Sequence, residues 1–264
     1  MYRIERIDSV TSTNDVCKER AAAGEKGNYV LISKEQTKGK GRLGRTWESE
    51  KGAGIYMSIL ERPDIHISMV PKLSLIMGLA ARKAIEEVTG LQVTVKWPND
   101  IVISGKKISG ILCEMGLKND NKDVDFAVIG IGINLYQEGF GEELKDRATS
   151  ILMEKALLGA DFSIESKENR DKYREKLENA VVKSWDSYYN EFLRSGSFKG
   201  FTDEFVDNCI NINNKVEVLD PKGEYQGMAV GINDNGELLV KVDNKEVRAI
   251  VSGEVSVRGV YGYV

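Results

Sequence analysis

Small residues alternate with large apolar residues in the segment Gly130-Ile131-Gly132-Ile133-Asn134. Successive side chains of an extended strand point to opposite faces, so the isoleucines share one face while the glycines and Asn134 share the other. The segment therefore predicts a strand that packs on a core with one face and leaves a shallow hollow on the other. Because glycine weakens a strand, we expect Gly130 and Gly132 to admit either a tightly packed neighbouring element or a ligand close to the backbone.

A further glycine, Gly110, lies in an apolar segment of its own and repeats this pattern. Together these glycines predict a flat slot in a mostly apolar pocket. Asn134 would supply a polar contact there, and so would Ser12 and Thr13 at the entrance of a predicted helix. The two hydroxyl residues would otherwise serve only as caps of that helix, with Asp15 in the capping-box position.

The loop Gly39-Lys40-Gly41-Arg42-Leu43-Gly44-Arg45-Thr46-Trp47 is rich in glycine and in cations. Glycines let a backbone fold around an anion, and Lys40, Arg42 and Arg45 would neutralise it. Trp47 adds an aromatic face that suits a purine base. The spacing matches neither the P-loop nor the dinucleotide-binding GxGxxG pattern, so neither standard nucleotide motif explains the loop.

A second charged segment, Lys96-Trp97-Pro98-Asn99-Asp100, is followed closely by Lys107. Pro98 cannot donate to a sheet and an Asn-Asp pair favours a turn, so the strand ends there and Asp100 stands at the mouth of a loop. Asp100 would either orient a metal ion or an incoming nucleophile, or simply stabilise the turn. Gly105 permits the hairpin that brings Lys107 to the same place.

The apolar pattern predicts a mixture of strands and helices over most of the chain. Strands are expected at 29–33, 55–60, 93–97, 101–103, 107–114 and 126–135, and helices at 16–23, 71–88 and 165–193. Short alternating segments at 215–219, 225–232, 237–242 and 246–251 predict a small β-barrel. We therefore expect an α+β fold with one domain at residues 1–213 and a second at residues 214–264.

Composition excludes several classes of protein. The chain has 37 basic and 41 acidic residues, a net charge of −4, which argues against a general nucleic-acid binder. Cys17, Cys113 and Cys209 are too widely spaced for a disulfide framework or a CxxC metal site, and they fit a reducing cytosol. His66 is the only histidine, which argues against a Ser-His-Asp triad. Without a signal peptide or a long apolar run, we expect a cytoplasmic protein that does not enter a membrane.

Segments spread over nearly the whole chain resemble, in order, the biotin protein ligases. They are Gly39 to Trp47, Lys96 to Asp100, Lys107 to Leu112, Gly130 to Leu135, Ala148 to Ile151 and Gly253 to Arg258. The first two, with the lysine that follows, carry most of the specificity. The resemblance implies a mixed β-sheet with helices and a small C-terminal SH3-like β-barrel.

The resemblance also implies a two-step ligase. Biotin and MgATP would form biotinyl-5′-adenylate and pyrophosphate, and a lysine of a biotin carboxyl carrier protein domain, as in acetyl-CoA carboxylase, would then attack the activated carbonyl. Joining a carboxylate to an α-phosphate brings two anions together, so Lys107, Arg42 and Arg45 would supply cations where charge develops. Magnesium would be carried mainly by the ATP phosphates, and no protein ligand is assigned to it.

By this resemblance, Lys107, Arg42 and Asp100 are the catalytic candidates. The residues expected to contact biotin are Ser12, Thr13, Asn14, Gln36, Gly39, Lys40, Gly41, Arg42, Lys107, Gly110, Gly132 and Asn134. The residues expected to contact ATP or the adenylate are Lys40, Arg42, Arg45, Trp47, Lys107, Asn134 and Arg258, and Trp47 would stack on adenine. Glu254 is the other barrel residue that we expect to matter.

Two features depart from the family pattern. Lys40 stands where many relatives carry arginine, which keeps the charge but gives up bidentate geometry. Some relatives carry an N-terminal DNA-binding domain, whereas this chain begins almost at the ligase module, so we expect no DNA partner. A lipoate or octanoate ligase is the nearest enzymatic alternative, and a non-catalytic biotin-responsive protein is the alternative of another class. Edge strands of the central sheet would allow a side-by-side homodimer.

Overall fold

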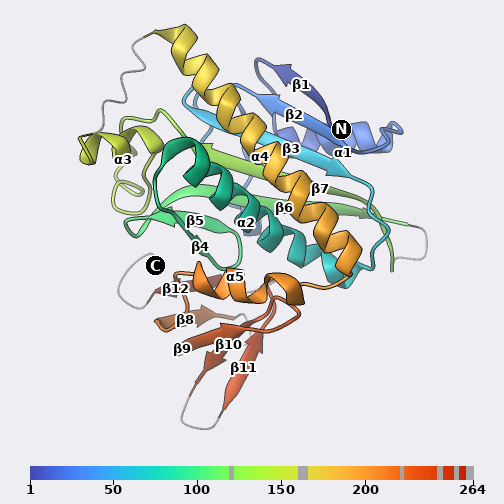
Figure 1. Cartoon of the computed structure of the whole chain (residues 1–264), viewed down its shortest axis with the longest axis vertical. Coiled ribbons are helices and arrows are strands. Elements are labelled where there is room, and N and C mark those ends of the chain that lie inside the picture. The colour runs from blue at the N-terminus through green and yellow to red at the C-terminus, as the bar shows by residue number, and fades with distance from the viewer. Residues whose placement is uncertain (119–121, 160–165, 221–222, 243–245, 253–255, 260–264) are drawn as a thin grey trace.

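Figure 1 shows a computed structural model that describes residues 1–118, 122–159, 166–220, 223–242, 246–252 and 256–259. A seven-stranded sheet in the order β1-β2-β3-β7-β6-β5-β4 forms the centre. Its strands are β1 (Arg3–Ile7), β2 (Tyr29–Ser33), β3 (Gly54–Glu61), β4 (Thr94–Lys96), β5 (Asp100–Ile103), β6 (Lys106–Leu117) and β7 (Val124–Asn134). Strands β1 and β2 are parallel and the other neighbours are antiparallel, so the expected mixed sheet is confirmed.

Helices α2 and α4 cover one face of this sheet, and α1 covers part of the other (Figure 1). The helices are α1 (Thr13–Ala22), α2 (Val70–Thr89), α3 (Ile151–Leu157), α4 (Lys167–Ser195) and α5 (Thr202–Asp207). The isoleucine face of β7 lies in the main core with α2 and α4, whereas Val128 joins a smaller core beneath α1. The first turn of α1 contacts β7 at Gly130. The rest of the glycine face of β7, from Gly132 onward, therefore lies beyond the N-terminal end of that helix.

Glycines end both long helices. Gly90 follows α2 with a φ of 71° and Gly196 follows α4 with a φ of 62°, the left-handed conformation that favours glycine. Ser166 caps the start of α4, where its hydroxyl accepts a hydrogen bond from the amide of Asn169 at 3.1 Å. The helices predicted at 71–88 and 165–193 are confirmed to within two residues at each end.

Helix α1 begins earlier than predicted, and the capping box expected at its start does not form. Ser12 occupies the N-cap position but makes no side-chain capping bond. Asp15 instead pairs with Lys18 at 3.0 Å and with Lys40 at 2.6 Å. The first turn therefore directs its polar side chains to groups other than the free amides of the helix.

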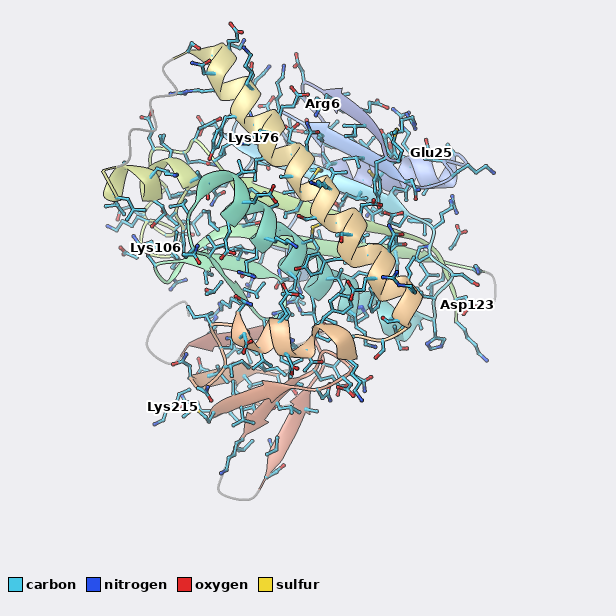
Figure 2. All side chains as sticks on the ribbon, viewed as in Figure 1. Arg6, Glu25, Lys106, Asp123, Lys176 and Lys215 are labelled. Carbon is cyan, nitrogen blue, oxygen red and sulfur yellow. The ribbon has the colours of Figure 1, made fainter. Side chains whose placement is uncertain are left out.

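Strand β1 and the short helices α3 and α5 were not predicted. β1 lies at the edge of the sheet and carries charged residues, so its sequence lacks the apolar alternation of an inner strand. It is tied to α4 by Arg6, labelled in Figure 2, whose Nε donates to Glu178 Oε2 at 3.1 Å. Contacts to the rest of the fold thus stabilise segments that carry little local signal.

The C-terminal segments form a separate antiparallel sheet in the order β11-β10-β9-β8-β12, seen below the central sheet in Figure 1. Its strands are β8 (Lys215–Leu219), β9 (Tyr225–Ile232), β10 (Leu238–Lys241), β11 (Val247–Ile250) and β12 (Ser256–Gly259). The expected small all-β unit is present, with β12 as a strand that was not predicted. Glu254 lies outside the described residues, whereas Arg258 lies on β12.

Trp97 joins the two sheets. Its side chain is almost fully buried, and its indole Nε1 donates to the carbonyl of Gly236, before β10, at 3.0 Å. Its backbone amide donates to Asn211 Oδ1, just before β8, at 2.8 Å. The β4–β5 turn between Lys96 and Asp100 is therefore held against the C-terminal unit.

Candidate active site

The described residues line two adjoining cavities beside the loop 39–47. The smaller has a volume of about 50 Å³ and lies among this loop, the start of α1 and strands β6 and β7. The larger has a volume of about 1180 Å³ and lies among the loop, the β4–β5 turn, the segment 140–148 and β12. Both cavities are lined by Gly41, Arg42, Trp47, Asn99 and Lys107. The two charged segments of the sequence thus meet where the cavities join.

A hydrogen-bond network forms the polar wall of the small cavity. Gln36 Oε1 accepts hydrogen bonds from the backbone amide and the hydroxyl of Thr13 at 2.8 and 3.0 Å. Behind this wall, Ser58 Oγ lies 2.7 Å from Thr13 Oγ1 and 2.6 Å from Asn14 Oδ1. Asn14 Nδ2 donates to Glu114 Oε2 at 2.8 Å. Because each group is oriented by another, a ligand would meet donors and acceptors in fixed positions.

Ser58 and Glu114 were missed from the sequence. Ser58 is completely buried on β3, in register with Gly130 of β7. A hydroxyl within an otherwise apolar buried strand needs a hydrogen-bond partner, and this requirement is the signal that would have identified it. Glu114 carries no such signal, because an acid near the end of a long strand is usually solvated.

The glycines do admit close neighbours, but these neighbours belong to the protein itself. A Cβ at Gly130 would lie 2.1 Å from Asn14 Oδ1, and one at Gly132 would lie 2.6 Å from Trp47 Nε1. A Cβ at Gly110 would lie 2.8 Å from Trp47 Cζ3. Of the two alternatives predicted for these glycines, a tightly packed neighbour is the one observed, and Gly110, Gly130 and Gly132 also line the small cavity beside those neighbours.

Trp47 forms a wall shared by the two cavities. Its indole lies against Gly110 and Gly132, and Lys107 Nζ lies 5.1 Å from the ring centroid. Its Nε1 is buried and has no hydrogen-bond partner among the described residues. The loop is thus anchored by an aromatic side chain at the point where the two cavities meet.

Lys107 is held in place by hydrogen bonds of its backbone and by an ion pair of its side chain. Its amide donates to the carbonyl of Arg147 at 2.8 Å, and its carbonyl accepts from the amide of Thr149 at 2.9 Å. Its Nζ forms an ion pair with Asp100 Oδ1 at 2.6 Å across the β5–β6 hairpin. The hairpin predicted around Gly105 therefore brings these two catalytic candidates into direct contact.

Both cations and acids line the wide cleft, and several of the cations lie near Lys96. The pKa of Lys96 is lowered to about 8, mainly by burial and also by the nearby Lys107, Arg258 and Arg45, while Asp100 opposes the shift. Lys96 was not among the predicted site residues, although it lies in the same motif as Asp100. Repulsion between these cations is relieved when an anion binds among them, so the cleft suits a polyphosphate.

Arg42 connects the loop to two other parts of the chain. Its Nη1 donates to Asn99 Oδ1 at 2.9 Å, and its Nη2 donates to the backbone carbonyl of Ser252. Lys40 turns instead toward α1, where its Nζ lies 2.6 Å from Asp15 Oδ1. Of these two predicted phosphate contacts, Arg42 is the one that lines both cavities.

Comparison with known proteins identifies the family to which these features belong. Residues 5–134 match the biotin/lipoate A/B protein ligase family, and residues 212–258 match the biotin protein ligase C-terminal domain. The bifunctional ligase/repressor BirA of Bacillus subtilis is 32% identical over 94% of this chain and 72% of its own. The chain belongs to the biotin protein ligase family. The biotin–[acetyl-CoA-carboxylase] ligase of Mycobacterium tuberculosis is 27% identical over 96% of this chain and 88% of its own.

A solved biotin protein ligase has the same fold. The enzyme from Aquifex aeolicus, in complex with biotin and ATP, superposes with a TM-score of 0.80 at 31% identity and covers 98% of this chain and all of its own. The match extends over both sheets, so that enzyme shares the arrangement of the central and C-terminal units. It also supports the α+β fold expected from the sequence.

The other residues predicted from the ligase motifs differ in which cavity they line, and one lines neither. Asn134 lines the wide cleft and donates through Nδ2 to the carbonyl of Thr149 at 3.0 Å. Gly39 lines neither cavity; a Cβ there would lie 2.2 Å from the carbonyl of Trp47, so this glycine lets the two ends of the loop cross. Gln36 and Ser12 line the small cavity, and Arg45 and Arg258 line the cleft.

Two tests of the described part of the chain bear on metal and membrane binding. No group of three or more His, Cys, Asp or Glu side chains that would hold a metal ion occurs among the described residues. In the same residues, no helix is both long enough and apolar enough to span a bilayer.

Proposed function

We propose that the chain catalyses the ATP-dependent attachment of biotin to a protein. In the first half-reaction the biotin carboxylate attacks the α-phosphorus of ATP, biotinyl-5′-adenylate forms and pyrophosphate leaves. In the second, the amine of an acceptor lysine attacks the acyl carbonyl, an amide forms and AMP leaves. The observation that carries the proposal is the shared junction of a small cavity and a wide cleft, lined by Arg42 and Lys107.

The small cavity is the proposed biotin site. Its lining combines apolar side chains such as Met57 and Ile111 with the polar wall of Thr13 and Gln36, which suits a ring system with one polar end. A volume of about 50 Å³ holds only about four water molecules. The floor is a hydrogen-bonded sheet, so the loop that carries Trp47 is the wall that moves when biotin enters.

The wide cleft is the proposed nucleotide site. Trp47 offers a ring face on which adenine would stack, and Lys96, Arg45 and Arg258 supply positive charge for the phosphates. Lys107, at the junction, would contact the biotin carboxylate and the α-phosphate together. Cations held in place before the reaction stabilise the developing charge without reorganising.

Magnesium fits the proposed reaction as a companion of ATP. The described residues offer Asp100 near the phosphate-binding cations but no cluster of acids. When bound, the ion would neutralise charge on the β- and γ-phosphates and assist the departure of pyrophosphate. Its binding by the protein alone is therefore expected to be weak.

Asp100 has a proposed role in both half-reactions. Its ion pair orients Lys107 before the nucleotide binds. Once a phosphate attracts Lys107, the carboxylate is available to orient the incoming amine and accept its proton. The acceptor in this proposal is a lysine of the biotin carboxyl carrier domain of a carboxylase such as acetyl-CoA carboxylase.

A homodimer is proposed through an open sheet edge. Strand β6 pairs with β5 as far as Gly110, and within the described residues its end from Leu112 to Leu117 pairs only with β7. Met115 and Leu117 are each 37% exposed along this stretch. Such an edge can pair with the same edge of a second copy. Sedimentation or light scattering with and without biotin and ATP would test this.

Pyrophosphate release tests the proposed function. Biotin or lipoate would be offered separately with MgATP, and Lys107→Ala would serve as the control. Release that depends on biotin and is lost in the variant supports the proposal. Release that depends on lipoate would identify a lipoate ligase, and silence with both acids would leave a non-catalytic biotin-responsive protein.

A further inference from the structure

We infer that Asn99 is a positioning residue that acts through Arg42, and this inference rests on the proposed function. Asn99 lies in the β4–β5 turn and lines both cavities. Its Oδ1 accepts a hydrogen bond from Arg42 Nη1 at 2.9 Å. The Asn99 side chain would thereby determine where the guanidinium stands when the acyl phosphate forms.

Hydrogen bonds to neighbouring strands fix the orientation of the Asn99 side-chain amide independently of Arg42. Its Nδ2 donates to the carbonyl of Ile111 at 3.0 Å, and its own carbonyl accepts from the amide of Ile111 at 2.8 Å. Its backbone amide donates to the carbonyl of Lys96 at 3.2 Å. Because Nδ2 is engaged with β6, Oδ1 must face the loop.

The loop depends on anchors of this kind. Internal hydrogen bonds join Gly41 to Arg45 at 2.7 Å and Trp47 to Gly39 at 3.0 Å, so the loop is a small closed unit on the surface. Leu43 at its tip is 57% exposed and has a φ of 56°. Asn99 belongs instead to the buried hairpin next to Trp97, so it can hold the loop against a rigid part of the fold.

An amide suits this position better than a carboxylate does. Asn99 Oδ1 and the carbonyl of Ser252 are both neutral acceptors, so they orient the Arg42 guanidinium without cancelling its charge. A carboxylate at position 99 would pair with Arg42 and compete with a phosphate. The geometry therefore assigns Asn99 a purely orienting role.

A double-mutant cycle on adenylate release tests the inference. The dissociation rate of preformed biotinyl-5′-adenylate would be measured in the full chain for Asn99→Ala, Arg42→Ala and the double variant. A hydrogen bond to a charged group corresponds to a change of about tenfold or more, so we expect Asn99→Ala to release the adenylate about ten times faster. The double variant should release it no faster than Arg42→Ala alone, because the same interaction is already lost.

Two results would overturn the inference. One is an unchanged release rate in folded Asn99→Ala, and the other is a double variant whose effect is the product of the two single effects. Asn190→Ala, on the exposed face of α4, is the matched control. If wild-type protein forms no adenylate from biotin and MgATP, the proposed function fails, and not this inference.

A second variant covers the case in which Asn99→Ala does not fold. Asn99→Asp keeps an acceptor at the Oδ1 position, adds a charge against Arg42 and removes the Nδ2 donor to the carbonyl of Ile111. We expect the KM for ATP to rise about tenfold in the wild-type background and to change little in the Arg42→Ala background, where the partner is already lost. An equal rise in both backgrounds would indicate a general structural effect and would contradict the assigned role.

Discussion

Trp47 lies directly against Gly132, at a distance that leaves no room for a side chain on β7. A Cβ at position 132 would be 2.6 Å from both Cε2 and Nε1 of the indole. Gly132, on the glycine face of β7, thus accommodates a residue of the loop that borders both cavities. The contact explains how the flat face of the sheet and the glycine-rich loop form one site.

Gly132→Ala should therefore displace Trp47 from the sheet. Crowding of this kind costs about 1–3 kcal/mol when neighbours must shift. We expect KM for both biotin and ATP to rise, because Trp47 borders both cavities. Steady-state kinetics check this, with Gly231→Ala on β9, where a Cβ meets its nearest neighbour only at 3.9 Å, as the control. Unaltered KM values in Gly132→Ala would show that Trp47 can move at no cost.

Lys107→Ala should abolish pyrophosphate release without unfolding the protein. Loss of one positioned donor for a developing anion lowers kcat by about 100- to 1000-fold. Lys106→Ala is the matched control, since Lys106 is the neighbouring lysine at the start of the same strand and is labelled in Figure 2. A folded Lys107→Ala variant with near-normal release would remove this lysine from the mechanism.

Ser58→Ala should weaken the binding of biotin but not of ATP. The hydroxyl orients Thr13 and Asn14 from behind the cavity, and loss of one such hydrogen bond corresponds to about a tenfold change in affinity. Calorimetric titration with each substrate alone would measure both effects. If the Kd of ATP rose by the same factor as the Kd of biotin, the substitution would have disturbed the sheet as a whole.

The affinity for ATP should decline as pH rises through about 8. Lys96 has a pKa lowered to about 8 by burial, so its positive charge is present below that pH and is lost above it. We expect kcat/KM for ATP to fall above pH 8 in wild-type protein and to stay level in Lys96→Arg, which remains charged. A pH profile that is the same in both proteins would exclude Lys96 from phosphate binding.

Glu61→Gln should stabilise the protein at neutral pH. Glu61 is buried where Tyr2 and Trp185 donate to the same oxygen, and burial raises its pKa. The stability that comes from its protonated form is present below the pKa of the unfolded chain and is lost as pH rises through the folded pKa. Urea unfolding should show a gap between the two proteins that widens from acid to neutral pH, and a gap that is constant with pH would refute the assignment.

Much of the site was predictable because its residues lie in local patterns. The alternation through Gly132 placed the strand and its open face, and the turn after Pro98 placed Asp100 beside Lys107. These patterns depend on strand geometry and turn propensity, which act within a few residues. The long helices were predictable for the same reason, because the glycines that end them, Gly90 and Gly196, directly follow the helical pattern in the sequence.

The unpredicted features depend on contacts between distant segments. Asn99 looked like a turn residue, yet its amide joins the loop to β6. Ser58 has the sequence context of a core strand residue, and the contact between Trp47 and Gly132 joins the loop to β7. None of these pairings follows from local propensity, because each is decided by how the sheet brings separate strands together.

The hydrogen bond from Arg42 to the carbonyl of Ser252 spans 210 positions of the chain. Bringing together residues so far apart in the chain costs loop-closure entropy, which the rest of the fold must offset. A polypeptide still lacking its last strands would have neither the β12 wall of the wide cleft nor this restraint on the loop. If Arg42 retains the adenylate as proposed, the C-terminal unit would make control over this reactive intermediate conditional on a finished chain.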